Sequence, residues 1–221
     1  DKVDEIGYPC YLKAAMSMSG VGIYRCETET ELTQAMSQFK AGIPVQVQEE
    51  IIAESFLNMQ YRVTENDVIR LVASEPILEE GAGQGNRVPA SHEPWGEVDS
   101  MAYWLKEIGM QGIFSFDIAV VQTPFGLRFP VIECTPGFNE VTYPTLIAQK
   151  LNIREWQSRT IAIKNNCLGD LEIQDVEYND STGEGLIIVN WGTIEQGKLM
   201  VMLAGSPEYQ EVLGNELEAR L

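Results

Sequence analysis

Residues 112–138 read GIFSFDIAVVQTPFGLRFPVIECTPGF, and this stretch determines the fold class. Two apolar runs, 112–121 and 127–134, flank a Gln-Thr-Pro-Phe-Gly turn, which predicts two adjacent antiparallel strands. Asp117 lies in the first run and Glu133 in the second. Because burying a bare charge is costly, each carboxylate needs a partner or a metal ion. On one face they could hold Mg²⁺. The alternative is a strand cap for Asp117 and an arginine pair for Glu133.

A hairpin is predicted near the start of the chain, where residues 7–26 read GYPCYLKAAMSMSGVGIYRC. One strand ends at Lys13, and a turn of small residues leads into the returning strand. Glycines with exposed N–H groups beside a cation can bind phosphate, although a plain solvent turn explains the same residues. Neither a Walker A sequence nor a GxGxxG after a strand is present. Residues 48–52, QEEII, could present backbone groups to adenine, or form a solvated strand end.

The other segments predict an α+β protein with an antiparallel sheet. A capping box of Thr28 and Glu31 begins a helix that we expect to run to Gly42. Residues 79–97 are rich in glycine and proline and predict a long loop. We further expect strands at 43–52, 55–63 and 67–78, helices at 98–108, 144–151, 153–163 and after Ser206, and a hairpin at 185–205.

Composition excludes several classes of partner. The formal net charge of -18 repels nucleic acids and anionic membranes. Four scattered cysteines and one histidine do not predict a zinc site, and they favour a reducing, cytoplasmic location. The sequence has no apolar run long enough to cross a membrane and no signal peptide. Since Asp1 is not an initiator methionine, we expect a fragment.

Four features follow one another along the chain: the lysine with its glycine-rich hairpin, VQEEI, FDIAVV and VIECTPGF. In this order they resemble the ATP-grasp superfamily, the fold of biotin carboxylase, D-alanine–D-alanine ligase and glutathione synthetase. The resemblance covers Gly7 to about Leu151. It implies an ATP-grasp fold of antiparallel sheets flanked by helices, with the family's N-terminal pre-grasp domain absent. The implied division is a nucleotide-binding core at 1–151, with a lid subdomain at about 7–52 and a metal-binding sheet at about 53–151. Residues 152–221 form an extension.

The resemblance also implies the site residues. For the nucleotide, it implies that Lys13 contacts the adenine and α-phosphate, that Glu54 contacts the ribose, and that the adenine pocket is lined by Glu49, Glu50 and Ile51. The residues implied to close over the phosphates are Ser19, Gly20 and Gly22. Asp117 and Glu133 would bind Mg²⁺, and the implied substrate residues are Gly137, Asn139 and Tyr143. Arg87 is a candidate catalytic residue, which would bind a substrate carboxylate or an acyl phosphate. Mn²⁺ is a possible substitute for Mg²⁺.

The expected activity is an ATP-dependent ligase, in which a carboxylate receives the γ-phosphate and an amine then displaces phosphate. Its partners are a small carboxylate and an amine, and a homodimer is left open. One alternative is a carboxylase-type subunit that acts on bicarbonate. The other is a degenerate module with a binding or regulatory role, favoured by Thr135, which stands where the family usually has asparagine.

Overall fold

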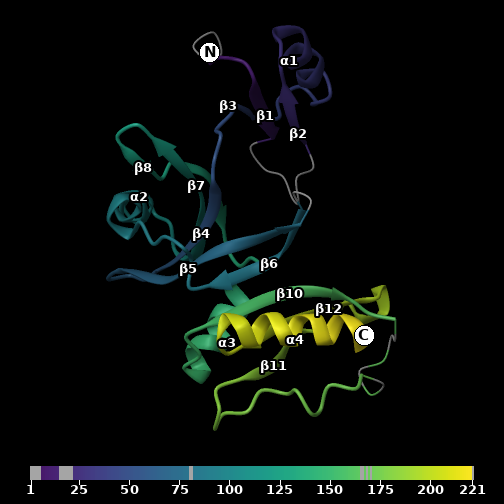
Figure 1. The fold of residues 1–221 in the computed structure, drawn as a ribbon. Coiled ribbons are helices and arrows are strands. Elements are labelled where there is room, and N and C mark those ends of the chain that lie inside the picture. Colours follow the sequence, from purple (N-terminus) through teal and green to yellow (C-terminus); the bar gives the residue numbers. More distant parts are fainter. Residues whose placement is uncertain are drawn as a thin grey trace. The chain divides into compact units, whose positions relative to one another are not determined.

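The computed structural model describes residues 6–14, 22–79, 82–164, 167, 169 and 171–220. The chain divides into two compact units, residues 1–52 and 53–221, and each is described by itself (Figure 1). In the part of the chain that the structure describes, no helix is long and apolar enough to cross a membrane.

Unit 1 is a small antiparallel sheet with one helix. Strands β1 (Cys10–Ala14), β2 (Ile23–Cys26) and β3 (Val45–Glu49) pair in the order β2-β1-β3, which confirms the predicted hairpin. Helix α1 (Glu29–Met36) begins after Thr28, whose side chain accepts a hydrogen bond from the N–H of Glu31. The core contains residues of both sheet and helix: Cys10, Leu12, Cys26, Leu32 and Ala35.

The prediction that this helix continues to Gly42 is wrong. After Met36 the backbone tightens, because the N–H of Gln38 bonds to the carbonyl of Ala35 and that of Phe39 to the carbonyl of Met36. These bonds span three residues instead of four, as in the last turn of many helices. Phe39 nevertheless packs on the core, which explains the helical spacing of the apolar residues.

Unit 2 contains a large antiparallel sheet. Its strands are β4 (Ser55–Val63), β5 (Val68–Glu79), β6 (Ala82–Val88), β7 (Gly112–Thr123), β8 (Gly126–Arg128), β9 (Val131–Pro136), β10 (Trp156–Ala162), β11 (Gly185–Asn190) and β12 (Lys198–Ala204). Among the described residues they pair in the order β11-β12-β10-β6-β5-β4-β7-β8, and β9 also pairs with β7. The helices are α2 (Trp95–Glu107), α3 (Thr142–Leu151), the short 3₁₀ helix η3 (Ile194–Gln196) and α4 (Pro207–Arg220).

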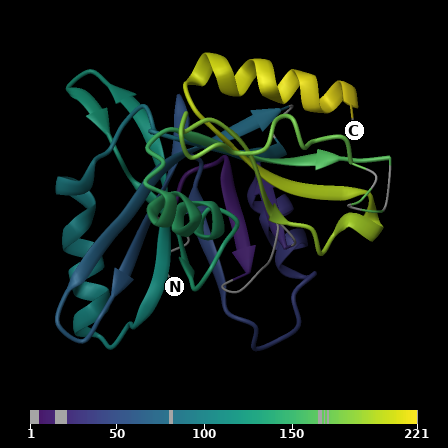
Figure 2. The same ribbon diagram turned by 90° about the horizontal axis from the view of Figure 1, so that it is seen from below.

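Two helices cover different parts of this sheet. Val98 and Ala102 of α2 pack against the apolar side chains of β4 and β7. Helix α4 lies along β10 and β12, as Figures 1 and 2 show, with Leu213 and Leu217 buried in a second apolar cluster. The N–H of Tyr209 bonds to the hydroxyl of Ser206, which confirms the predicted cap of this helix.

Two other predictions fail in the same region. Residues 82–88 are not loop but strand β6, and residues 156–162 are not helix but strand β10. The two strands pair with each other, so each supplies backbone partners that a single sequence window does not reveal. A Cβ on Gly85 would lie 1.8 Å from the carbonyl oxygen of Ser158. Gly85, one of the glycines that led to the loop prediction, is therefore the residue that allows β10 to approach β6.

Candidate functional site

The two predicted metal ligands are direct cross-strand partners. Asp117 on β7 faces Glu133 on β9 in an antiparallel pair. Residues that oppose each other in this way project to the same face of the sheet. Asp117 is half-buried and Glu133 is exposed, so the pair lies where a solvated ligand could reach it. Asn58 of β4, the partner of Asp117 on its other side, donates a hydrogen bond from Nδ2 to Asp117 Oδ1 at 2.6 Å.

Strand alternation explains why these polar side chains gather. On β7, Phe114, Phe116 and Ile118 belong to the apolar cluster that includes α2. Successive side chains of a strand point to opposite faces, so Ser115 and Asp117 project away from that cluster. The same alternation separates Met59 of β4 from its neighbours Asn58 and Gln60. One face of these strands is thus apolar, and the other carries polar groups.

The carboxylate pair changes the chemistry of a neighbouring thiol. Loss of solvation raises the pKa of Cys134, and the negative charges of Asp117 and Glu133 raise it further. Negative charge therefore concentrates at this point of β7 and β9, as a cation site requires. The donor atoms also fit Mg²⁺, which prefers oxygen ligands and is often held by one or two carboxylates plus phosphates and water. Among the described residues, no group of three or more His, Cys, Asp or Glu side chains could hold a metal.

The segment after β9 carries the three predicted substrate residues, Gly137 and Asn139 in the loop and Tyr143 in the first turn of α3. Gly137 has φ +102°, a left-handed conformation that favours glycine, and its N–H bonds to the carbonyl of Ile113. Asn139 is held by protein groups, because its Oδ1 accepts bonds from the N–H groups of Val141 and Thr142 at 3.1 and 3.2 Å. Tyr143 is 53% exposed and so remains available for contact.

Arg87 forms an ion pair with Glu75 on the neighbouring strand. Arg87 Nη2 lies 2.8 Å from Glu75 Oε1, and the N–H of Ser91 donates to Glu75 Oε2 at 3.0 Å. Burial alone would raise the pKa of Glu75, but these hydrogen bonds outweigh it and lower the pKa. About half of the Arg87 side chain is exposed. The guanidinium therefore anchors to a buried carboxylate while part of it faces solvent.

Unit 1 holds most of the residues predicted to contact the nucleotide. Lys13 on β1 pairs with Ile23 and Gln46 on the strands at either side. Gly22 has φ +81° where the hairpin returns. Ser19 and Gly20 lie outside the described residues.

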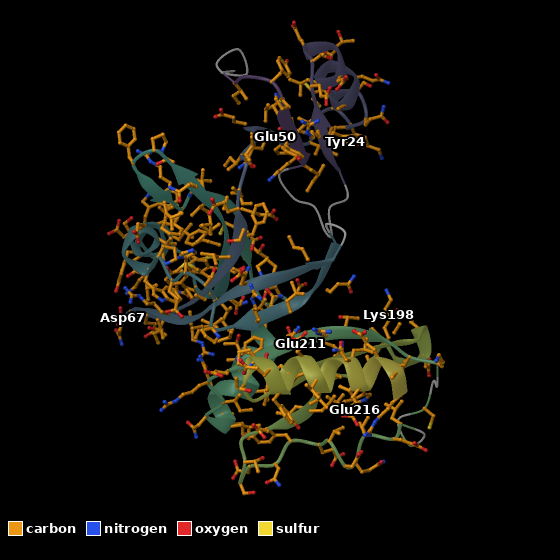
Figure 3. All side chains as sticks on the ribbon, viewed as in Figure 1. Tyr24, Glu50, Asp67, Lys198, Glu211 and Glu216 are labelled. Carbon is orange, nitrogen blue, oxygen red and sulfur yellow. The ribbon has the colours of Figure 1, made fainter. Side chains whose placement is uncertain are left out.

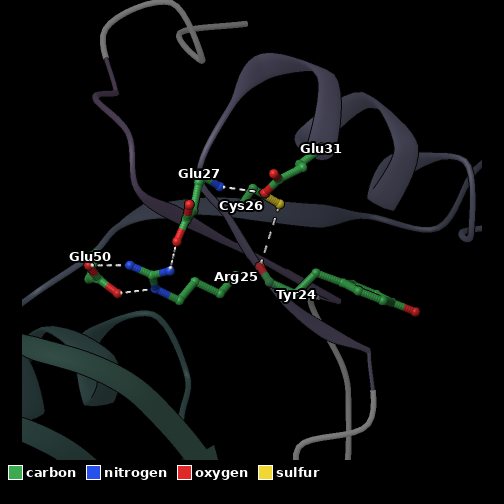
Figure 4. A network of polar contacts seen from close by, with 6 residues as sticks. All are labelled: Tyr24, Arg25, Cys26, Glu27, Glu31 and Glu50. Carbon is green, nitrogen blue, oxygen red and sulfur yellow. Dashed lines mark hydrogen bonds and ion pairs between the residues drawn. The ribbon is translucent and has the colours of Figure 1, made fainter.

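The end of β3 carries the predicted adenine-pocket residues. Glu49 is the last residue of β3, and Glu50 and Ile51 follow it. Glu50 accepts bonds from Arg25 Nε at 2.6 Å and Nη2 at 3.2 Å (Figure 4). Glu54 belongs to unit 2, where its N–H bonds to the carbonyl of Val120.

Sequence reasoning missed Asn58 and Gln60. Both side chains are at most 7% exposed, and a buried amide normally has hydrogen-bond partners. Their signal was present in the strand SFLNMQYRV, where two amides two residues apart interrupt an apolar run. That spacing places both on the face that carries Asp117.

Comparison with known proteins shows one local sequence match and many structural ones. No family model matches the chain. A formate-dependent phosphoribosylglycinamide formyltransferase of Prochlorococcus marinus (strain MIT 9312) is 43% identical over 63 residues, which is 28% of this chain and 16% of that protein.

Three solved structures represent the structural likeness. A carboxyaminoimidazole ribonucleotide synthase of Aspergillus clavatus with ATP and an N5-carboxyaminoimidazole synthetase of Staphylococcus aureus with ADP both align with a TM-score of 0.64, at 12% and 14% identity. They match 100% and 99% of this chain. A biotin carboxylase of Campylobacter jejuni aligns with a TM-score of 0.62 at 16% identity over 92% of this chain.

The chain spans 65%, 62% and 55% of the length of these three structures. At such low identity the likeness establishes the fold, and the relatives are ATP-grasp enzymes. The mixed α and β architecture, with largely antiparallel sheets and flanking helices, agrees with them. The chain therefore has the ATP-grasp fold.

Proposed function

We propose that this chain carries the nucleotide- and metal-binding machinery of an ATP-dependent ligase. In the proposed reaction a carboxylate attacks the γ-phosphate of ATP, ADP leaves, and an amine displaces phosphate from the resulting acyl phosphate. The observation that carries the proposal is the cross-strand pair of Asp117 and Glu133. Two carboxylates on one sheet face, in a fold whose relatives were solved with ATP or ADP, fit a site for metal-bound phosphates.

Asp117 and Glu133 would hold Mg²⁺, or Mn²⁺ in its place. When bound, the metal neutralises charge on the phosphates during transfer. The half-buried position of Asp117 and its bond from Asn58 fix one carboxylate, while exposed Glu133 can adjust to the ligand. Thr135 offers a hydroxyl where the family usually has an amide oxygen, so we expect the second magnesium ion to bind more weakly.

We further propose the nucleotide contacts that the resemblance implies. We assign the adenine and α-phosphate to Lys13, the adenine edge to Glu49, Glu50 and Ile51, the phosphates to Ser19, Gly20 and Gly22, and the ribose to Glu54. Arg25 supports this assignment by orienting Glu50, since its planar guanidinium bonds to both oxygens of that carboxylate.

The acceptor acid would lie near Gly137, Tyr143 and Arg87. The exposed part of Arg87 offers a guanidinium to a carboxylate or acyl phosphate, and its pair with Glu75 holds the side chain in place. The activities named for two relatives suggest which acids to test first. One is formate-dependent, and a 2-oxoglutarate carboxylase domain was solved with bicarbonate. We therefore propose a small carboxylate acceptor and an amine, acting in the cytoplasm, with a carboxylase-type reaction on bicarbonate as the second candidate.

The first experiment is calorimetric titration of the chain with Mg-ATP. Glu133→Gln and Lys13→Ala should each weaken binding, by about tenfold if one charge-assisted contact is lost. Glu211→Gln on α4 and Lys198→Ala on β12 are matched controls, and we expect wild-type affinity from both (Figure 3).

Phosphate release then separates a ligase from a binding module. Formate, bicarbonate and amino acids are offered as acids, each with and without amines such as glycinamide. Release that depends on one of these acids supports the ligase. Saturable binding of Mg-ATP without acid-dependent release would instead favour the degenerate module. A folded chain that binds no nucleotide at millimolar concentration would refute the ligase proposal for this chain and leave a regulatory module.

A further inference from the structure

We propose that Gln60 is a positioning residue that ties the loop at 137–142 to the carboxylate of Asp117. Gln60 is fully buried on β4. Its Nε2 donates a hydrogen bond to Asn139 Oδ1 at 2.6 Å and another to Asn58 Oδ1 at 3.3 Å. We call Asn58, Gln60 and Asn139 the amide relay. The roles given to its two ends rest on the proposed function, whereas the connection itself does not.

One end of the amide relay reaches the proposed metal site. Asn58 donates from Nδ2 to Asp117 Oδ1 at 2.6 Å, and the two residues are direct partners on β4 and β7. Asn58 is 7% exposed, so few water molecules can compete for this bond. A change in the position of the Asp117 carboxylate must therefore move Asn58 or break this partly buried hydrogen bond.

The other end sets the shape of the proposed acceptor loop. Asn139 Oδ1 accepts from Gln60 and also from the N–H groups of Val141 and Thr142, which lie at the start of α3. Its Nδ2 donates to Ser115 Oγ at 3.1 Å, and Ser115 is on β7, two residues before Asp117. The loop is thus fastened to two neighbouring strands, and its link to β4 passes through Gln60.

The cost of this arrangement indicates what Gln60 does. Gln60 Oε1 is buried and has no hydrogen-bond partner among the described residues. A buried polar atom without a partner is destabilising, and an apolar side chain of similar size would avoid that penalty. Gln60 therefore contributes less to stability than methionine could, but it supplies two N–H groups that methionine lacks. Those two groups are what join the loop to the side chain that holds Asp117.

Hydrogen exchange tests the link directly. In Gln60→Met we expect the amides of Val141 and Thr142 to exchange about fivefold faster, as the loss of one net hydrogen bond implies. Saturating Mg-ATP should slow these amides further in the wild type but not in Gln60→Met. Asn58→Leu removes the hydrogen bonds of Asn58 with Asp117 and Gln60 but leaves the bond of Gln60 to Asn139. This variant should keep the wild-type exchange rate without ligand and also lose the response to Mg-ATP. ATP affinity in EDTA should be unchanged in both variants, a result that a general loss of structure would not give.

Gln210→Met is the matched control. Gln210 is also a buried glutamine, 4% exposed, and its Nε2 donates to the carbonyl of Gly205 at 2.6 Å. This variant should show wild-type exchange at Val141 and Thr142 and the wild-type response to Mg-ATP. Wild-type loop exchange in Gln60→Met would overturn the proposal, as would an equal effect in Gln210→Met. If the wild type binds no Mg-ATP but Gln60→Met still speeds loop exchange, the positioning role stands and the proposed ligase fails.

Discussion

Gly85 on β6 lies against the carbonyl oxygen of Ser158 on β10, so closely that a Cβ at position 85 would sit 1.8 Å from that oxygen. This contact joins the strands that continue to β12 and β11 to the strands that carry the carboxylate pair. Any larger residue at position 85 must push the two backbones apart.

Gly85→Ala should therefore destabilise unit 2, by about 3 kcal/mol or more, within the range for severe steric substitutions. Urea unfolding followed by tryptophan fluorescence measures this unit, because Trp95, Trp104, Trp156 and Trp191 all belong to it. Gly96→Ala is the control. A Cβ there meets no atom within 4 Å, and alanine is favoured in a helix by about 0.5–1 kcal/mol. Equal stability of Gly85→Ala and wild type would contradict the close approach of the strands.

Replacing Arg87 should expose the cost of burying Glu75. Arg87→Met leaves the Glu75 carboxylate with the hydrogen bond from the N–H of Ser91. We expect the free energy of unfolding to fall by about 1–3 kcal/mol at pH 7. The paired carboxyl has a lowered pKa, so its contribution to stability is present at neutral pH and disappears as the pH falls through that pKa. The stability difference between variant and wild type should thus narrow at pH values below 4.5, the ordinary pKa of glutamate.

Urea unfolding at pH 7 and at pH 4 measures this narrowing. Arg128→Met, at an exposed arginine of β8, should change stability by no more than about 0.5 kcal/mol at either pH. A loss for Arg87→Met that stays constant with pH would show that packing of the arginine, and not its charge, stabilises this part of the sheet.

The ion pair of Arg25 and Glu50 predicts that unit 1 is sensitive to acid. The hydrogen bonds from Arg25 lower the pKa of Glu50 below its ordinary value of 4.5. The unfolded chain therefore binds this proton more readily, and stability declines as the pH falls below 4.5. Glu50→Gln should flatten that decline. Protection factors of the β1 and β2 amides between pH 3 and 6 provide the measurement, since unit 1 contains no tryptophan.

Glu211→Gln, at an exposed glutamate of α4, serves as the control and should retain the wild-type decline. If Glu50→Gln and wild type lose protection in parallel, other carboxylates govern the acid response of unit 1.

The sequence predicted those helices and strands whose caps or apolar periodicity lie within the element itself. The capping box at Thr28, the helix after Ser206 and the strand with FDIAVV all have a sequence period or cap that tertiary contacts did not override. Strands β6 and β10 were missed because neither has such a signal, and each gains its backbone hydrogen bonds from the other. Pairing between residues about 70 positions apart is invisible in a short window.

Some residues of the candidate site could likewise be predicted from the sequence, and others could not. Asp117 and Glu133 were identifiable because charges stand out in apolar strands, and their direct pairing agrees with the two adjacent antiparallel strands predicted for residues 112–121 and 127–134. Asn58 and Gln60 are neutral, so they give a weaker signal, and their importance depends on a register that only the structure supplies. The roles assigned to Lys13, Gly22 and the residues after β3 stay predictions until nucleotide binding is measured.

The amide relay contains no group that gains or loses a proton in the physiological range. Asn58, Gln60 and Asn139 bond through neutral dipoles, and all but the last are buried. Added salt screens such bonds far less than it screens exposed ion pairs such as Arg25 with Glu50. The loop and Asn58 should hence keep the same mutual placement when the acidity or ionic strength of the surroundings changes.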